Sequence, residues 1–528
     1  MYKETARNLA AGCLLLISFL TGASDEPLDE AIRQTLAQRS EACAPGLAAS
    51  ELAAPGLLHE LYARQAFVAL WQQPNRRTAL KQALLQVADD GLDPADYPLD
   101  DRRAATSSLQ QQACADLQAS HSYLRALQHL AHGRLEQDSI EPFWRAPGSA
   151  SPRPRPGVLE LALNGLDRPS EAFAAARPAL LQYQALRQAY AERRRGPIDE
   201  WPLIPAGHLL RPDSRDERIP LLAARLAAEG YLAARPATDA GLYDATLLAA
   251  VLDFQARHGL QADGLVGPQT LSALNTSARE RLEQLQVNLE RWRWLANDIE
   301  AETLLVDIAG GLLSYYVEQQ LRWQGRAVVG RPSRQTPQLK SLVNRLTLNP
   351  TWSVPPTILR EDKLPEIRRD PNYLARHQMR VLDRHGEPLD PTGIDWENPG
   401  NIILRQDAGP DNPLGRLAIR FPNPFSVYLH DTPSQQLFSK SPRAFSSGCV
   451  RIEGILELLA ALLPADDCSE IAQRLDSGQT QEFPIRRRLP IVIAYWTAAV
   501  AATGELVLRN DLYERDRKLL FALREAGH

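Results

Sequence analysis

His430 and Cys449 are two residues of this sequence that together could form a nucleophilic thiol site. His430 directly follows the run Phe425–Leu429, whose β-branched and aromatic residues predict a strand. Cys449 comes nineteen residues later, inside the turn-like sequence Ser-Ser-Gly-Cys. A thiol attacks a carbonyl carbon as its thiolate, and a neighbouring histidine makes the thiolate available by accepting the thiol proton. The pair therefore predicts covalent acyl-transfer chemistry.

The sequence on either side of Cys449 suits that chemistry. Gly448 allows a tight turn, so main-chain N–H groups around Ser447 and Gly448 could hold a developing oxyanion. The apolar run Ile455–Leu463 predicts a helix, and its positive end is expected close to the thiol, where it would lower the thiol pKa.

Three further residues near the pair are candidates for substrate contact: Arg451, Tyr428 and Ser446. A guanidinium two residues after the cysteine suits a carboxylate. The alternative is that Arg451 orders the loop through an ion pair. Each feature is common on its own, and their combination in one short stretch favours catalysis.

Length and composition limit the class of protein. A chain of 528 residues is too long for one ordinary core, so two to four domains are expected. Its 44% hydrophobic and 23% charged residues are typical of a soluble globular protein. A formal net charge of −5 argues against a nucleic-acid binder, which usually has a basic face.

The first 23 residues resemble an export signal. Lys3 and Arg7 precede the short apolar stretch Leu9–Leu20, and Thr21-Gly22-Ala23 suits cleavage. Retention as an uncleaved membrane anchor is the alternative. The apolar stretch is shorter than the roughly 20 residues of a spanning helix.

Four cysteines remain after the signal. Export permits disulfides, so Cys43 and Cys114 are predicted to form a staple within the N-terminal domain. Cys468 is expected to be a partly buried structural thiol.

The elements around the pair predict a multidomain α+β protein. Residues 28–200 are predicted to be a helical domain, with helices at Leu57–Leu70, Thr78–Asp90, His121–His132 and Ala172–Arg195. His129 and His132 have the i, i+3 spacing of metal ligands, but no third ligand is evident and no metal site is predicted.

The C-terminal half changes from helical to strand periodicity. Residues 215–276 predict a three-helix module, with Leu247, Val251 and Phe254 on one helix face, and residues 277–299 predict a bridging helix. A mixed, β-rich domain is predicted at 300–515, with strands at 303–308, 312–317, 327–329, 491–496 and 505–508. The proline-rich segment Thr351–Gly409, with a helix-like middle at Asp362–His377, is expected to be an inserted lid that frames the substrate.

The three-helix segment resembles the peptidoglycan-binding domain 1 family over its whole length. The matching features include Phe254-Gln255, Gly259-Leu260, Asp263-Gly264 and Thr270-Leu271. The resemblance implies a module that docks on cell-wall glycopeptide. The alternative is a helical spacer without a ligand.

The β-rich domain resembles the YkuD-type L,D-transpeptidase catalytic domain, in which a histidine precedes a Ser/Thr-His-Gly-Cys-x-Arg motif. Ser447 stands where most members have histidine, and the long YcbB-like branch carries Ser-Ser-Gly-Cys there. The branch similarity covers nearly the full chain. It includes GLDPADY (91–97), NLERWRW (288–294), VGRPSRQTP (329–337), NPTWSVP (349–355), RQDAGPDNPLGR (405–416), FPNPFSVYLHDTP (421–433), RAFSSGCVR (443–451) and IAYWTA (493–498).

This resemblance implies a periplasmic enzyme with Cys449 as nucleophile and His430 as general base and acid. In the family, the thiolate attacks the carbonyl of the third stem residue, diaminopimelate, expels D-Ala and forms a thioester. The amine of a second stem resolves the thioester and gives a 3→3 crosslink. N–H groups around Ser447–Cys449 are implied as the oxyanion hole, and carbapenems as acylating agents. No metal or organic cofactor is implied. Tetrapeptide stems are the implied donor and acceptor, with other wall-synthesis enzymes as possible partners.

Other functions were weighed against this one. A non-catalytic wall-binding scaffold has no need of both His430 and Cys449. A sortase-like enzyme carries its arginine on a later strand, whereas Arg451 is two residues from the cysteine. A wall hydrolase or carboxypeptidase on the same fold stays open, because the sequence does not separate water from an amine as acceptor.

Overall fold

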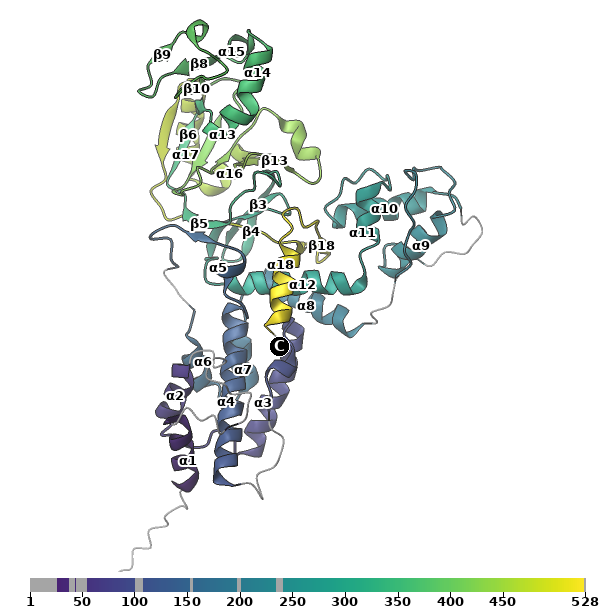
Figure 1. Ribbon diagram of the computed structural model, residues 1–528, viewed down its shortest axis with the longest axis vertical. Helices are drawn as coiled ribbons and strands as arrows, with labels where there is room; N and C mark the ends of the chain where they lie inside the picture. Colours follow the sequence, from purple (N-terminus) through teal and green to yellow (C-terminus); the bar gives the residue numbers. More distant parts are fainter. Residues whose placement is uncertain are drawn as a thin grey trace, which may run out of the picture.

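The computed structural model describes residues 26–37, 43, 55–99, 108–151, 155–196, 201–233 and 241–526. The predicted export signal, residues 1–23, lies outside these residues. Figure 1 shows a helical N-terminal region at the bottom, a small helical module at the right and a β-rich domain at the top. The predicted multidomain α+β organisation is confirmed. Within the described part of the chain, no helix is long and apolar enough to cross a membrane.

The N-terminal region is an assembly of helices, and the main helices before residue 177 share one apolar core. Its main helices are α1 (Glu26–Ala37), α2 (Pro55–Arg64), α3 (Pro74–Gln86), α4 (Leu109–His132), α6 (Val158–Asn164), α7 (Pro169–Ala176) and α8 (Leu181–Arg195). The central helix α4 begins at Leu109 because Ser108 and Gln111 form a capping box at its start.

All four helix predictions in this region were wrong in their bounds. The helix expected over His121–His132 is the second half of α4, which begins at Leu109. The first helix stops at Arg64, because Ala66 and Phe67 adopt positive φ angles. The second begins at Pro74 and not at Thr78, since proline suits the first helical position. The helix expected over Ala172–Arg195 is two helices, α7 and α8. Arg177 is extended ahead of Pro178, as the residue before a proline usually is.

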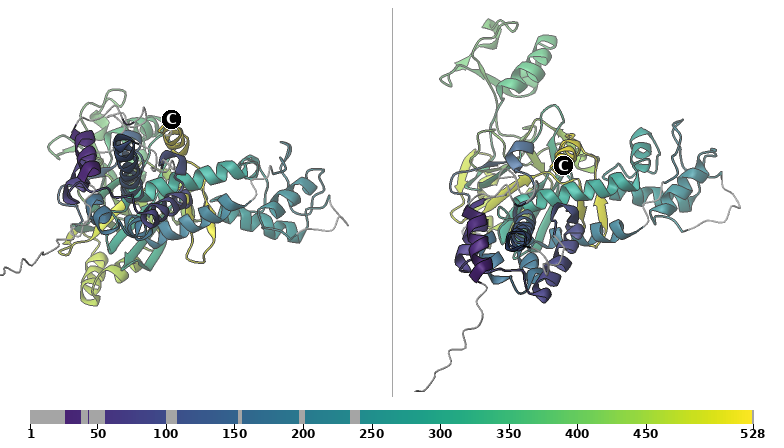
Figure 2. Two further views of the ribbon diagram at one scale, coloured as in Figure 1. Left: turned by 90° about the horizontal axis from the view of Figure 1, so that it is seen from below. Right: turned by 60° about the horizontal axis from the view of Figure 1, so that its bottom comes forward.

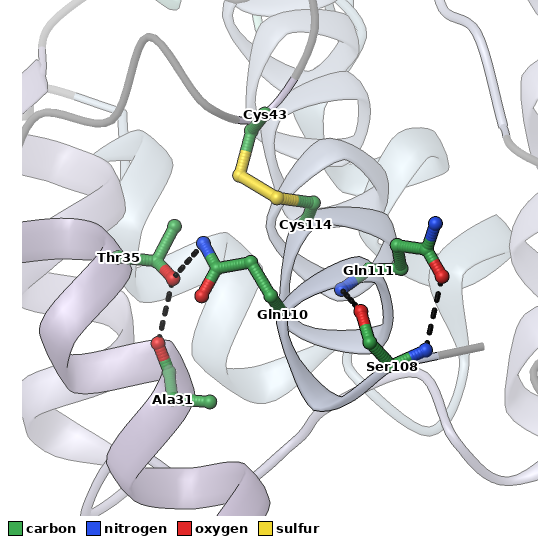
Figure 3. Close-up of a disulfide and its surroundings, with 7 residues drawn as sticks. All are labelled: Ala31, Thr35, Cys43, Ser108, Gln110, Gln111 and Cys114. Atoms are coloured by element: carbon green, nitrogen blue, oxygen red, sulfur yellow. Dashed lines mark hydrogen bonds between the residues drawn. A yellow bond between two sulfur atoms is a disulfide. The ribbon is translucent and has the colours of Figure 1, made fainter.

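The predicted disulfide between Cys43 and Cys114 is confirmed, with a Cα–Cα distance of 5.2 Å. Figure 3 shows the bond between Cys43 and Cys114, which lies near the start of α4. Next to it, the Gln110 side-chain amide donates a hydrogen bond of 3.1 Å to the Thr35 hydroxyl. The disulfide and this hydrogen bond join the N-terminal end of the described chain to α4.

Replacing both Cys43 and Cys114 with serine should destabilise the helical region. The bond spans 71 residues, and closing a loop of that size is worth at most about 4 kcal/mol in the chain-entropy account. Denaturant unfolding followed by circular dichroism measures the loss. Reduction of the wild-type protein is the matched comparison, and equal stability in both redox states would contradict the prediction.

The module at the right of Figure 1 contains the three predicted helices, α9 (Ile219–Ala228), α10 (Ala245–Arg257) and α11 (Pro268–Leu274). The predicted face of α10 is fully buried, with Leu247, Val251 and Phe254 in the module's core. The side chain of Gln255 joins α10 to the turn before α11, because it donates to the Leu265 carbonyl and accepts from the Gly264 N–H.

Helix α12 (Ala278–Leu295), expected as a bridge, is buried between the helical region and the β-rich domain (Figure 2). Its Glu290 accepts hydrogen bonds from the main chain of the helical region at Leu135. On the side of the β-rich domain, Asn288 exchanges hydrogen bonds with Thr497, and the Trp292 ring stacks on Trp496. The apolar side chains of the helix therefore belong to a core that the helical region and the β-rich domain share.

The β-rich domain is built on one mixed sheet. Across the sheet the strands are β1 (Trp144–Arg145), β5 (Leu339–Leu342), β16 (Pro490–Ala494), β2 (Glu302–Asp307), β3 (Leu312–Val317), β4 (Gln320–Gly330), β14 (Val450–Ile452), β12 (Leu429–His430), β11 (Leu417–Arg420), β6 (Arg345–Leu348) and β15 (Gln481–Pro484). Strand β13 (Ala444–Ser446) pairs with β4, and β17 (Ala498–Val500) with β18 (Leu506–Leu508) form a separate hairpin. The five strands expected at 303–308, 312–317, 327–329, 491–496 and 505–508 are present, but β4 begins at Gln320, seven residues earlier than predicted.

One face of this sheet packs against helices α16 (Ile455–Leu462) and α17 (Ala465–Asp476). Leu429, Val450 and Ile452 belong to that apolar core. Because side chains alternate along a strand, the neighbouring residues of β12 and β14 project from the opposite face.

The segment Thr351–Gly409 forms a subdomain at the top of Figure 1, named here the insertion. It has a small sheet of β7 (Trp352–Ser353), β10 (Ile403–Gln406), β8 (Met379–Leu382) and β9 (Pro388–Leu389). The predicted helix is interrupted: it consists of a π-helical turn at Leu359–Lys363, then α14 (Leu364–Arg369) and, after Pro371, α15 (Tyr373–Arg376). The small sheet was not predicted.

Candidate active site

Strands β12 and β14 bring the two segments that carry the predicted pair side by side. They run parallel, with Leu429 opposite Val450 and His430 opposite Arg451. The Val450 N–H continues the ladder to the Tyr428 carbonyl at 3.1 Å. Since Leu429 and Val450 face the core, the side chains of Tyr428 and His430 lie on the same outer face as those of Cys449 and Arg451.

The strand predicted over Phe425–Leu429 was wrong for most of its length, because only its last residue is in β12. Asn423 holds the segment as a loop, since its side-chain oxygen accepts from the N–H groups of Phe425 and Val427. Ser426 takes a positive φ of 56° in this loop. The loop brings the Ser426 carbonyl to Cys449, whose thiol donates to it at 3.7 Å.

Cys449 is held as a thiol in the resting site. Burial raises its pKa above the usual value, and this is the largest effect. Hydrogen bonds from Tyr428 and the charges of Arg420 and Arg451 act in the opposite direction. The site therefore holds groups that stabilise a thiolate once a base has taken the proton.

His430 has the properties of that base. Its side chain is almost fully buried, and burial, followed by the charge of Arg451, lowers its pKa from 6.5 to about 3. Its Nδ1 lies 2.5 Å from the Asp431 carbonyl oxygen. A carbonyl only accepts, so Nδ1 carries the proton and Nε2 has a free lone pair. The ring is thus neutral and able to accept a proton at Nε2.

The turn before Cys449 is braced by Ser446. This serine is buried, accepts a hydrogen bond from the Gly448 N–H at 3.1 Å and donates to the Cys449 carbonyl at 2.5 Å. Its hydroxyl is therefore committed inside the turn and not to substrate. The Gly448 N–H is also occupied. Among the described residues, the N–H groups of Ser447 and Cys449 have no acceptor, so they are the ones free to meet an oxyanion.

The expected help from a helix N-terminus was wrong. Strand β14 lies between Cys449 and α16, which begins only at Ile455. A strand of three residues separates its ends by about 10 Å. The field of a helix end falls off within about one turn, so α16 cannot account for thiol activation.

Arg451 has no ion pair with any described residue, so the loop-ordering alternative finds no support. Its Nε is buried without an acceptor, and burial lowers its pKa. A thiolate at Cys449 would act in the opposite direction and raise the pKa of Arg451.

Arg420 was missed by sequence reasoning. It lies on β11, next to β12, and its guanidinium lies 3.7 Å above the centre of the Tyr428 ring. Its Nε donates to the Thr347 hydroxyl at 3.3 Å, and no described carboxylate pairs with it. The only sequence signal was an arginine alternating with core residues in a strand that precedes the histidine.

Ser447, which departs from the common family pattern, is exposed and accepts a hydrogen bond of 2.9 Å from Arg334. Arg334 also pairs with Glu361 and Asp362 of the insertion, both at 2.6 Å. Tyr428 contacts the insertion from the other side, because its ring packs on the insertion's apolar core. The insertion therefore contacts the segment of Tyr428 directly and the turn of Ser447 through Arg334.

A separate cavity of about 640 Å³ lies away from this face, between Gly259–Ala262 of the three-helix module, strand β3 and the loop 438–443. Neither His430 nor Cys449 lines it. Among the described side chains, no cluster of three or more His, Cys, Asp or Glu residues could hold a metal ion.

The geometry is that of a cysteine–histidine site on the outer face of a mixed sheet. Residues 301–478 match the family "L,D-transpeptidase catalytic domain", known as YkuD. Residues 56–189 match "Scaffold domain", and residues 215–274 match "Putative peptidoglycan binding domain". The chain thus carries a YkuD-type L,D-transpeptidase catalytic domain, together with a scaffold domain and a peptidoglycan-binding domain.

A curated Haemophilus influenzae protein named "Putative L,D-transpeptidase" is 36% identical over 245 residues, 46% of this chain. The chain spans about half, 49%, of that relative's length. Solved L,D-transpeptidases of Mycobacterium smegmatis and Xylanimonas cellulosilytica are each 15% identical, with TM-scores of 0.17. The alignments cover 37% and 55% of this chain, and 58% and 99% of those chains, respectively. Both scores are too low to superpose whole chains.

Proposed function

We propose that this protein is a peptidoglycan L,D-transpeptidase that forms 3→3 crosslinks through a cysteine thioester. The observation that carries the proposal is the neutral His430, with Nε2 free, on the same sheet face as Cys449 within a YkuD-type domain. The match to a peptidoglycan-binding domain supports a cell-wall substrate.

The acylation step follows from these positions. His430 Nε2 accepts the Cys449 proton as the sulfur bonds to the carbonyl carbon of the third stem residue. The carbonyl oxygen becomes an oxyanion, held by the N–H groups of Ser447 and Cys449. The C–N bond then breaks, and His430 returns the proton to the departing amine of D-Ala. A thioester remains on Cys449.

The second step repeats the proton transfers and bond changes of acylation in reverse order, with a different amine as the reactant. The side-chain amine of another stem's diaminopimelate attacks the thioester carbon and gives its proton to His430. The C–S bond breaks, the sulfur recovers the proton and an amide links the two stems. Water in place of the amine would give hydrolysis. The site acts in the periplasm, with residues 1–23 as export signal or anchor.

Incubation with purified disaccharide-tetrapeptides tests the function. Mass analysis should detect D-Ala release, an acyl-enzyme and a dimer lacking one D-Ala. Release without a dimer would identify the hydrolase. A protein that neither releases D-Ala nor gains the mass of a carbapenem would be a wall-binding scaffold.

Arg420 is placed to hold a carboxylate of the donor stem, because it has no described acidic partner and lies beside Tyr428. Arg420→Ala should weaken donor use. A hydrogen bond to a charged group is worth about 1.5–3 kcal/mol, so kcat/KM should fall roughly 10- to 100-fold. Rates of D-Ala release measure this.

Arg345→Ala is the matched control. Arg345 is the register partner of Arg420 on β6, but it is exposed and paired with Glu482 at 3.2 Å. It should leave the rate unchanged. Amidation of the donor's stem carboxylates should lower kcat/KM of the wild-type enzyme. The factor should equal the loss that Arg420→Ala causes with the normal donor. Equal rates for Arg420→Ala and wild type would contradict the role.

A further inference from the structure

Arg334 lies on the loop between β4 and β5, and this loop is fixed to the catalytic turn. The fully buried Thr336 hydroxyl accepts from the Gly330 N–H and donates to the Gly448 carbonyl, both at 2.9 Å. The main-chain N–H of Thr336 donates to the Tyr513 hydroxyl at 3.1 Å. Buried, satisfied hydrogen bonds of this kind rigidify a segment. The loop is therefore fixed to the Gly448 end of the turn, whereas Ser447 is exposed.

The Arg334 guanidinium extends from that loop to the insertion. Nη1 donates to Asp362 at 2.6 Å and Nη2 to Asp362 at 3.0 Å, in a two-pronged contact. Nη2 also donates to Glu361 at 2.6 Å. The side chain is only 11% exposed. These bonds lower the pKa of both carboxyls, so both are charged at neutral pH and keep the pairing.

The same Nη1 donates to the Ser447 hydroxyl at 2.9 Å. One nitrogen thus links the insertion to the residue whose N–H is free for an oxyanion. The carboxylates of Asp362 and Glu361 fix the plane of the guanidinium, because a planar fork that meets two acids cannot rotate without losing hydrogen bonds. Without them, nothing described would hold that nitrogen on Ser447.

We propose that Arg334 is a positioning residue that couples docking of the insertion to the shape of the Ser447–Cys449 turn. When the insertion is docked, the turn is held with its free N–H groups in place. When it lifts, Ser447 loses its partner and the turn loosens. The coupling itself does not depend on the proposed function. Its consequence does, and that consequence is that acylation is fastest with the insertion docked over the substrate.

The double variant Glu361→Gln plus Asp362→Asn tests the coupling without touching the turn. Both substitutions keep side-chain size and remove charge from residues that are 48% and 36% exposed, so the fold is retained. Hydrogen exchange of a peptide spanning 444–452 should become faster, while exchange in α4 stays the same. Acylation by a carbapenem should slow about tenfold, the effect of a coupling near 1.4 kcal/mol.

The rate at which neutral iodoacetamide alkylates Cys449 is measured in a Cys468→Ala background, with and without the double variant. The two rates should agree within about twofold, because alkylation forms no oxyanion. Arg334→Ala should reproduce these effects. Adding it to the double variant should cause little further loss, because Arg334 is the partner that Glu361 and Asp362 share. Asp362 also lies 3.6 Å from Arg331, so Arg331→Ala alone should leave the exchange of the 444–452 peptide unchanged. Arg360→Ala is the matched control. Arg360 is 70% exposed and pairs with Glu361 at 3.4 Å. Its removal should change none of the readouts.

Unchanged exchange of the 444–452 peptide in the double variant would overturn the inference, whatever the enzyme does. Fully additive losses on combining it with Arg334→Ala would also overturn it. If the peptide exchanges faster but carbapenems do not acylate even the wild-type protein, the coupling stands and the proposed function fails. If wild-type acylation is normal and the double variant matches it in exchange and rate, the function stands and the coupling fails.

Discussion

Cys449→Ala is expected to abolish D-Ala release, acyl-enzyme formation and crosslinking. The reason is chemical: the thioester needs a sulfur, and no other described nucleophilic thiol lies on that sheet face. The fold should persist, because the side chain loses one atom and its thiol makes only a weak hydrogen bond, 3.7 Å to the Ser426 carbonyl, beside its interaction with Tyr428. Intact mass spectrometry with a carbapenem and a thermal melt measure both expectations.

Cys468→Ala is the control for this experiment. Cys468 is the other free cysteine among the described residues and is also partly exposed. It lies in α17, on the helical side of the sheet, where its thiol contacts main-chain carbonyls of Leu459 and Leu463. It should keep full activity. Activity that survives in Cys449→Ala and is lost in Cys468→Ala would reverse the assignment.

His430→Ala should slow acylation by roughly 10²- to 10⁴-fold, the usual worth of a positioned base. The reaction should then depend more steeply on pH, because hydroxide must remove a thiol proton whose pKa is raised by burial. Single-turnover acylation measures the rate. His385→Ala is the control, since His385 is an exposed histidine of the insertion. A His430→Ala rate near that of wild type would rule out the base.

The pH profile of the wild-type enzyme follows from the lowered pKa of His430. A histidine at its ordinary pKa of 6.5 would be protonated, and useless as a base, in mild acid. Because burial and Arg451 lower the value to about 3, the proton is bound only at lower pH. Acylation kcat/KM should therefore show no acid limb near 6.5, and its decline should begin only as pH approaches about 3. A half-maximal rate near 6.5 would contradict this.

The paired histidine and cysteine were predictable because the signal is local. Each is marked by its own short sequence, and family resemblance needed only the motif around Ser447. The two strands that place them are very short, and β14 was not predicted at all. That omission led to the wrong inference about α16, since a direct turn-to-helix connection was assumed.

The residues that sequence reasoning missed depend on long-range geometry. Arg334 meets Ser447 across 113 positions of sequence, and Arg420 reaches Tyr428 because two strands pair in a given register. Neither arginine stands out in composition. Ser447 indicated the branch of the family. Its hydrogen-bond partner, Arg334, could not be predicted, because the two residues meet only in the folded domain.

Helix α12 changes where the catalytic domain begins. The composition changes near residue 300, and the family match starts at 301. Yet Trp292 and Asn288 hold Trp496 and Thr497, which adjoin the end of β16. A fragment cut at residue 300 would present an unpaired tryptophan face to water. The smallest piece that can fold around Cys449 must include α12, so the unit of folding starts earlier than the unit of sequence similarity.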